Sequence, residues 1–163
     1  MQLPPAIEVR TRWLDDEIIY ASTEGHICQI VMVAAGMDTR AFRLKLPNGC
    51  RFFELDYPDI LTEKQNKLAE CLPNCERYLI AVDLRDDWPS VLVDKPFDPT
   101  APTIWVVEGL LCYLTHDDVL KLFAKIDSMS ALGSVVLYDV VGQSLLKSES
   151  AKMLHDLAQQ FGT

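Results

Sequence analysis

The amino-acid sequence predicts an α/β protein, in which a mostly parallel β-sheet carries helices on both faces. Two observations indicate it: short apolar runs recur along the chain, and segments with helical spacing of apolar residues lie between them. Strands that alternate with helices form parallel β-α-β units with right-handed crossovers. The 163 residues suit a single domain, which we expect to span residues 1–163.

The apolar runs read as strands buried on both faces, because they are short and rich in β-branched and aromatic residues. We expect these strands at residues 29–34, 51–55, 77–82, 103–107 and 134–140. We expect helices at residues 7–21, 58–70, 87–93, 116–129 and 143–161. Thr115, with Asp118 three residues later, resembles the capping box that begins a helix.

Composition narrows the classes of partner. Twenty-four acidic against 15 basic residues give a formal net charge of -9, which opposes binding to nucleic acid and to anionic membranes. No apolar run is long enough for a transmembrane helix, and the first ten residues do not form a secretory signal. The five cysteines do not form paired metal-binding knuckles. We therefore expect a cytoplasmic protein with reduced thiols and no bound metal.

In a parallel sheet, ligands bind beyond the carboxyl ends of the strands, so the residues after each strand are the ones to inspect. A turn of small residues, Ala34-Ala35-Gly36, follows the first strand and allows a ligand to approach the backbone. It is not the G-x-G-x-x-G pattern of a dinucleotide phosphate loop. Taken alone, this turn is equally consistent with an ordinary strand-to-helix connection.

Acidic residues follow the next three strands: Asp56, Asp83 and Glu108. Singly, Asp56 can bind the hydroxyls of an adenosine ribose or be a solvated loop residue, and Asp83 can contact an adenine or cap a helix. Glu108 ends so apolar a run that it needs a ligand donor or an internal arginine. Together they offer acceptors for the hydroxyls, the amine and the ammonium of one ligand. S-adenosyl-L-methionine carries those donors and no phosphate, which accounts for both the acids and the missing phosphate loop.

The strings QIVMVAAGMDTRAFRL, FELDYP, AVDLRDDW and PTIWVVEGLLCYLT resemble the leucine carboxyl methyltransferase-like family from Arg10 to about Tyr138. This resemblance implies a Rossmann-like methyltransferase fold with S-adenosyl-L-methionine as cofactor. It implies that Arg10 pairs with the methionine carboxylate and that Asp56 binds the ribose. It further implies that Asp83 and Leu84 contact the adenine, that Glu108 lies near the amino group, and that the turn at Ala34 and Gly36 lies under the amino-acid moiety.

The sequence departs from the family pattern in two ways. Family members often have glycine where Ala34 stands, and a methyl group there can crowd the cofactor. Family members are also usually longer, so we expect the C-terminal strands to be lacking and a sheet edge to be exposed, which a homodimer could cover. We expect Asp38 and Arg40 to form a salt bridge that braces the turn.

The predicted reaction is in-line attack by a substrate oxygen on the sulfonium methyl group, with a small molecule or a protein C-terminus as acceptor. A carboxylate acceptor needs no general base, whereas a hydroxyl needs a proton acceptor, and the sequence identifies no catalytic residue. Tyr113 and His116 lie near the expected site. Two alternatives stay open: a non-catalytic or truncated cofactor-binding module, and a nicotinamide-dependent oxidoreductase, which would share Asp56.

Overall fold

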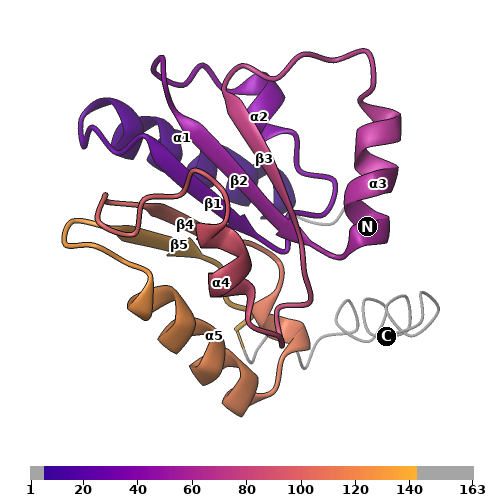
Figure 1. Ribbon diagram of the computed structural model, residues 1–163, viewed down its shortest axis with the longest axis vertical. Coiled ribbons are helices and arrows are strands. Elements are labelled where there is room, and N and C mark those ends of the chain that lie inside the picture. The colour runs from indigo at the N-terminus through magenta and orange to yellow at the C-terminus, as the bar shows by residue number, and fades with distance from the viewer. Residues whose placement is uncertain (1–5, 143–163) are drawn as a thin grey trace.

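The computed structural model describes residues 6–142, which form a five-stranded, fully parallel sheet (Figure 1). The strand order is β3-β2-β1-β4-β5. The strands are β1 Gln29–Val33, β2 Arg51–Asp56, β3 Glu76–Ala81, β4 Ile104–Val107 and β5 Val135–Tyr138. All five expected strands are present, and the predicted Rossmann-like α/β fold is confirmed. The first strand ends one residue and the fifth two residues before its expected end. Ala34 and Asp139 therefore lie just beyond their strands.

The helices are α1 Ala6–Thr23, α2 Arg40–Arg43, α3 Pro58–Lys67, α4 Trp88–Val93 and α5 His116–Ser128, with a 3-10 turn, η1, at Leu111–Tyr113. The predicted cap of α5 is confirmed, because the Thr115 side chain accepts a hydrogen bond from the Asp118 backbone N–H. Helix α3 ends three residues earlier than expected, and α2 was not expected because four residues carry no periodic pattern. The helix expected at residues 143–161 lies outside the described residues.

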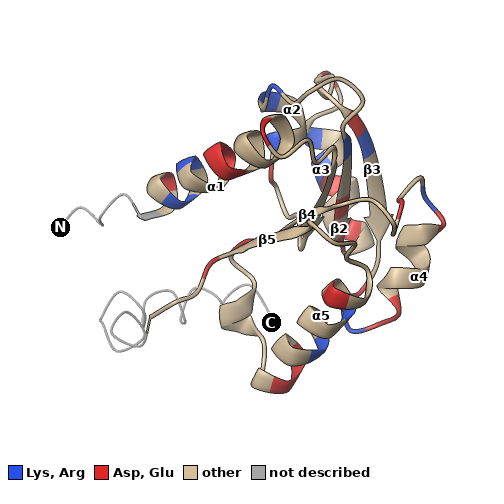
Figure 2. Cartoon of the chain, turned by 90° about the vertical axis from the view of Figure 1, so that its left-hand side faces the viewer, with Lys and Arg blue, Asp and Glu red and all other residues tan. Residues whose placement is uncertain are grey.

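Helices cover both faces of the sheet because successive strand side chains alternate between the faces. Ile30 and Met32 of β1 pack with Leu14 and Ile18 of α1 on one face. Val31 and Val33 face the other way, where the core includes Trp88 and Leu92 from α4 and Leu122 and Ile126 from α5. Figure 2 shows α1 and α5 on opposite sides of β5. Every residue of β1 is buried, as expected of a central parallel strand.

One buried acid lies inside the sheet rather than at its edge. Glu54 of β2 is 0% exposed and accepts hydrogen bonds from Arg77 Nε at 3.0 Å and Nη2 at 2.7 Å. The Nζ of Lys64, from α3, lies 2.8 Å from the same carboxylate. Two cations therefore neutralise Glu54, which ties α3 and β3 to β2 and leaves Glu54 no part in a ligand site.

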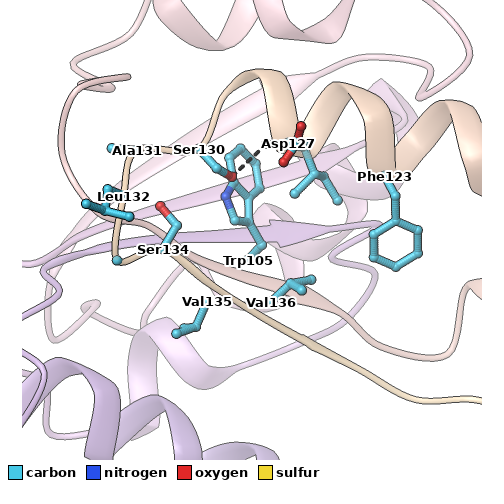
Figure 3. Close-up of a pocket in the computed structure, with 11 residues that line it drawn as sticks. Trp105, Phe123, Asp127, Ser130, Ala131, Leu132, Ser134, Val135 and Val136 are labelled. Atoms are coloured by element: carbon cyan, nitrogen blue, oxygen red, sulfur yellow. Dashed lines mark hydrogen bonds between the residues drawn. The ribbon is translucent and has the colours of Figure 1, made fainter.

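The side of the sheet at β5 is thinly covered. Val136 and Tyr138 project towards the α5 face and remain 38% and 46% exposed. A cavity of about 620 Å³ lies beside them, between the end of α5 and the start of β5, with Trp105 and Phe123 in its wall (Figure 3). This cavity lies at the amino ends of the strands, away from the edge where the predicted site residues lie. Dimerisation through β5 remains a prediction.

Within residues 6–142, no helix combines the length and hydrophobicity needed to cross a bilayer.

Candidate functional site

The turn after β1 forms the centre of the candidate site, since β1 is the middle strand. Gly36 has a φ of +46°, and a Cβ built on it would meet nothing within 4 Å, so the space above this residue is open. Ala34 has a φ of +56°, in the left-handed region that favours glycine. The glycine expected from the family at this position therefore has a conformational reason, because an L-residue with a Cβ is strained there.

The β2–β3 side of the site consists of Asp56 and Asp83. Asp56 ends β2, and its Oδ2 accepts a hydrogen bond from Gly36 N at 2.7 Å while Oδ1 accepts one from Tyr57 N at 2.7 Å. The carboxylate thus joins the end of β2 to the turn after β1. Its remaining lone pairs can accept further hydrogen bonds, because an ionised carboxylate has about four acceptor positions.

Asp83 lies two residues beyond β3 and pairs with Arg85. Arg85 Nε lies 2.9 Å from Oδ1, the Arg85 Nη2 also contacts the carboxylate, and the Arg85 backbone N–H donates to Oδ1 at 2.9 Å. These hydrogen bonds lower the pKa of Asp83 to about 2. Both partners lie at the surface, so the pair can open towards a ligand.

Leu84 is half-buried against the core that includes Trp88 and Leu122. A cavity of about 430 Å³ opens between Asp83 and α4, at the carboxyl ends of β2 and β3. Its wall includes Tyr57, Pro58, Val82, Asp83, Trp88 and Val91. A mixed apolar and acidic wall of this kind suits a planar ligand that carries hydrogen-bond donors.

The β4–β5 side of the site consists of Glu108 and Asp139, and its charges are paired over long sequence distances. Glu108 follows β4, and its Oε1 accepts a hydrogen bond from Arg10 Nε at 2.8 Å. Its Oε2 accepts one from Arg40 Nη1 at 2.6 Å. Of the two partners considered for Glu108, a ligand donor or an internal arginine, the structure supplies two internal arginines.

Arg10 reaches the strand ends from α1. It lies one turn before Leu14, which packs under the sheet, so Arg10 projects past the carboxyl ends of the strands. Its Nη1 donates to Asp139 Oδ2 at 2.8 Å, and Asp139 Oδ1 accepts from Gly109 N at 2.6 Å. Figure 2 shows the two basic residues of α1 between acidic ones. Arg10 therefore links the ends of β4 and β5, and it pairs with two carboxylates of this chain.

Behind this pair lies a buried cluster centred on Arg40, the first residue of α2, whose side chain is 1% exposed. Its Nη1 donates to Asp38 and its Nε donates to Asp15 Oδ1 at 2.7 Å, so the expected salt bridge between Asp38 and Arg40 is confirmed. Burial raises the pKa of Asp15, but hydrogen bonds from Arg43 and Arg40 outweigh it and hold that pKa below its ordinary value. Burial dominates at Asp38 and raises its pKa. The cluster fixes α1, the turn and Glu108 relative to one another.

Sequence reasoning missed Asp139 and Asp15. Asp139 was assigned to the interior of the fifth strand, whereas β5 ends at Tyr138 and Asp139 follows it directly. A strand ending at residue 138 would have added Asp139 to the acids that follow strands. Asp15 lies on α1 next to Leu14, a position at the border of the apolar stripe, and nothing local in the sequence marks its pairing with Arg40.

The two residues considered for proton transfer lie at the surface. Tyr113, in η1, is 64% exposed, and His116 is the exposed first residue of α5. No hydrogen bond within the described residues joins either side chain to Arg10, Asp56, Asp83 or Glu108. Among residues 6–142, no three His, Cys, Asp or Glu side chains are grouped to hold a metal ion.

The arrangement fits a zwitterionic ligand that bears an adenosine. Arg10 and Glu108 place a cation and an anion 2.8 Å apart beyond the end of β4, a neighbour of β1 in the sheet. An amino-acid group carries the complementary pair, a carboxylate and an ammonium. Asp56 flanks the turn on its other side, because β2 and β4 are the two neighbours of β1.

Comparisons with known proteins identify the family. A family model described as leucine carboxyl methyltransferase matches residues 1–127. A Parafrankia sp. (strain EAN1pec) protein named "Putative S-adenosyl-L-methionine-dependent methyltransferase" is 40% identical over 156 residues, covering 94% of this chain and 50% of the relative. A Streptomyces coelicolor protein with the same descriptive name is 47% identical over 131 residues, covering 79% and 46%. The chain thus spans about half the length of the curated relatives it matches.

Solved structures share the fold. A crystal structure of a duf574 family protein from Streptomyces avermitilis superposes with a TM-score of 0.72 at 15% identity, covering 93% of this chain and 61% of that one. A structure from Thermobifida fusca, titled as that of a putative methyltransferase, gives a TM-score of 0.69 at 19% identity, with coverage of 93% and 58%. Since the family model matches most of the sequence, the chain belongs to the leucine carboxyl methyltransferase family.

Proposed function

We propose that this chain binds S-adenosyl-L-methionine at the carboxyl ends of its strands and forms the cofactor site of an O-methyltransferase. The observation that carries the proposal is the Arg10–Glu108 pair beyond the end of β4, which presents a cation and an anion at the edge of the sheet where Asp56 also lies. The methionine carboxylate would bind Arg10 and the ammonium would bind Glu108. The backbone at Ala34 and Gly36 would lie under the amino-acid moiety.

The adenosine moiety would occupy the β2–β3 side. Asp56 would accept hydrogen bonds from the ribose hydroxyls with the lone pairs that Gly36 N and Tyr57 N leave free. Asp83 would accept from the adenine amine, and Leu84 would pack against the ring. The cavity of about 430 Å³ is lined by Asp83, which supports the placement of the adenine beside that residue.

When bound, the cofactor supplies a methyl group on a sulfonium centre, which is an activated leaving group. The residues of this chain contribute by holding and orienting that group, so positioning is their main catalytic effect. A carboxylate acceptor requires no base from the protein. A hydroxyl acceptor requires a proton acceptor, and the exposed Tyr113 and His116 are the candidates in the described part of the chain.

Calorimetry with S-adenosylhomocysteine and with NAD tests the proposal against a nicotinamide-dependent enzyme. We expect S-adenosylhomocysteine to bind and NAD not to bind, because the turn at Gly36 lacks the glycines of a phosphate loop. The matched variants are Arg10→Gln and Arg12→Gln, two residues apart on α1, since the Arg12 side chain is 79% exposed and pairs only with Asp16 in the described residues. Arg10→Gln should weaken S-adenosylhomocysteine at least tenfold, because it removes a cation from the ligand carboxylate and leaves the Asp139 carboxylate unneutralised beside it. Binding of NAD alone, or an equal loss in both variants, would overturn the assignment.

Transfer of a labelled methyl group separates an enzyme from a non-catalytic module. Small carboxylic acids, peptides with a free C-terminus and alcohols are the acceptors to compare, and a methyl ester is recognised by its release in mild base. The formal net charge of -9 favours such acceptors over nucleic acid. Cofactor binding without transfer to any of them would favour the non-catalytic module.

A further inference from the structure

Asp139 occupies the position in the site where an anionic ligand group would be expected. Its Oδ2 accepts a hydrogen bond from Arg10 Nη1 at 2.8 Å, so an internal carboxylate already holds one arm of this guanidinium. Its Oδ1 accepts from Gly109 N at 2.6 Å, which fixes the side chain across the gap between β4 and β5. The side chains of Arg10 and Asp139 remain 33% and 22% exposed, so solvent or a ligand can reach the pair.

Arg10 is shared by two carboxylates, and the two are not equally replaceable. Glu108 is 12% exposed and its second oxygen pairs with Arg40, which is 1% exposed. Moving Glu108 would leave a buried cation short of a partner, which costs free energy. Moving Asp139 away from Arg10 exposes a carboxylate that retains its backbone hydrogen bond from Gly109. An incoming carboxylate would therefore replace Asp139 and not Glu108.

We propose that Asp139 determines ligand specificity by competing with the cofactor carboxylate for Arg10. This inference rests on the proposed function. The bond from Arg10 to Asp139 must break before the ligand carboxylate can take its place, and the negative charge of Asp139 then remains beside the bound carboxylate. Both effects oppose binding of an adenosine ligand that carries the amino-acid group and leave a ligand without that group unaffected.

The sign of the expected effect distinguishes Asp139 from the other residues of the site. Asp139→Asn removes the negative charge but keeps an amide oxygen that can accept from Gly109 N. The variant should therefore bind S-adenosylhomocysteine about tenfold more tightly, as expected when one partly exposed like charge is removed at contact distance. Methylthioadenosine, which lacks the amino-acid group, should bind wild type and variant equally.

Calorimetry with both ligands tests the proposal, and Asp127→Asn is the control variant. It makes the same charge change on exposed Asp127, near the amino ends of the strands, and should alter neither affinity. Unchanged or weaker binding of S-adenosylhomocysteine by Asp139→Asn would overturn the inference, and so would an equal gain for methylthioadenosine. If wild type binds neither ligand, the proposed function itself fails.

A second measurement needs no variant. If Asp139 competes for Arg10, the ligand carboxylate contributes little net affinity to the wild-type protein. Replacing S-adenosylhomocysteine by its decarboxylated amine should then weaken binding by less than about tenfold, below the usual range for a charge-assisted hydrogen bond. A loss greater than about a hundredfold would show that Arg10 is fully available to the ligand and would overturn the proposal.

Discussion

Both sides of the candidate site place carboxylates just after strands, but the two sides pair these carboxylates differently. On the β2–β3 side, Asp83 pairs with Arg85, two residues away, and Asp56 binds backbone N–H groups. On the β4–β5 side, Glu108 and Asp139 bind Arg10, which is 98 and 129 residues away. On the β2–β3 side the paired groups are close in sequence, whereas on the β4–β5 side they join distant parts of the chain. A ligand can add hydrogen bonds to the acids of the β2–β3 side, but on the β4–β5 side it must replace an existing partner.

The largest expected effect is on stability, from Glu108→Gln. Losing this charge leaves Arg10 and the buried Arg40 each short of a partner, so the free energy of unfolding should fall by about 3 kcal/mol. Urea denaturation followed by circular dichroism measures the change. Asp83→Asn, on the β2–β3 side, is the matched variant and should leave the unfolding midpoint almost unchanged. Equal destabilisation by the two variants would remove the distinction between the sides.

Ligand affinity should respond to Asp56→Asn. The single amide oxygen can still accept from Gly36 N, and the exposed Tyr57 N can bond to water instead, but the charge that attracts ribose hydroxyls is lost. Binding of S-adenosylhomocysteine should weaken about tenfold with little change in stability. Calorimetry measures the affinity, and Glu63→Gln on the exposed surface of α3 is the control. An unaltered affinity would exclude Asp56 from ribose binding.

Two acids near the site, Asp83 and Asp38, should titrate in opposite directions. Arg85 holds the pKa of Asp83 at about 2, whereas burial raises the pKa of Asp38 above its ordinary value. Because the folded pKa of Asp83 lies below its unfolded value of about 3.9, its small, solvent-screened contribution to stability is present above that pH and is lost as the pH falls towards 2. Carboxyl carbon NMR reports both midpoints. Arg85→Ala should return Asp83 to its ordinary range, and a midpoint that stays near 2 would contradict the pairing.

The smallest effect concerns Ala34, at the junction of the two sides. Its φ of +56° costs an alanine about 1 kcal/mol, and glycine avoids this cost. Glycine is also more flexible in the unfolded chain, which reduces the gain in stability. Ala34→Gly should therefore raise the free energy of unfolding by about 0.5 kcal/mol. Thermal unfolding of the pair measures it. A clear loss of stability would mean that the Ala34 methyl group makes packing contacts that outweigh the strain.

The sequence was most informative where partners are local. The parallel sheet, the small turn at Gly36 and the acids Asp56 and Asp83 follow from apolar runs and from the residues directly after them. Glu108 was recognised as a carboxylate that needs a partner, but nothing in the sequence selects Arg10 and Arg40 from the fifteen basic residues, because their pairing depends on how α1 docks. Asp139 was missed because periodicity does not fix where a strand ends.

Arg10 leaves the ribosome early in synthesis, and the residue that completes its hydrogen bonds follows 129 positions later. Contacts between residues so distant in sequence form slowly, because a long loop must close before they can stabilise the chain. We therefore expect this corner of the protein to be assembled last, after β5 has been made and has joined the sheet. Hydrogen exchange on stalled nascent chains should show α1 becoming protected only when residue 139 is outside the exit tunnel.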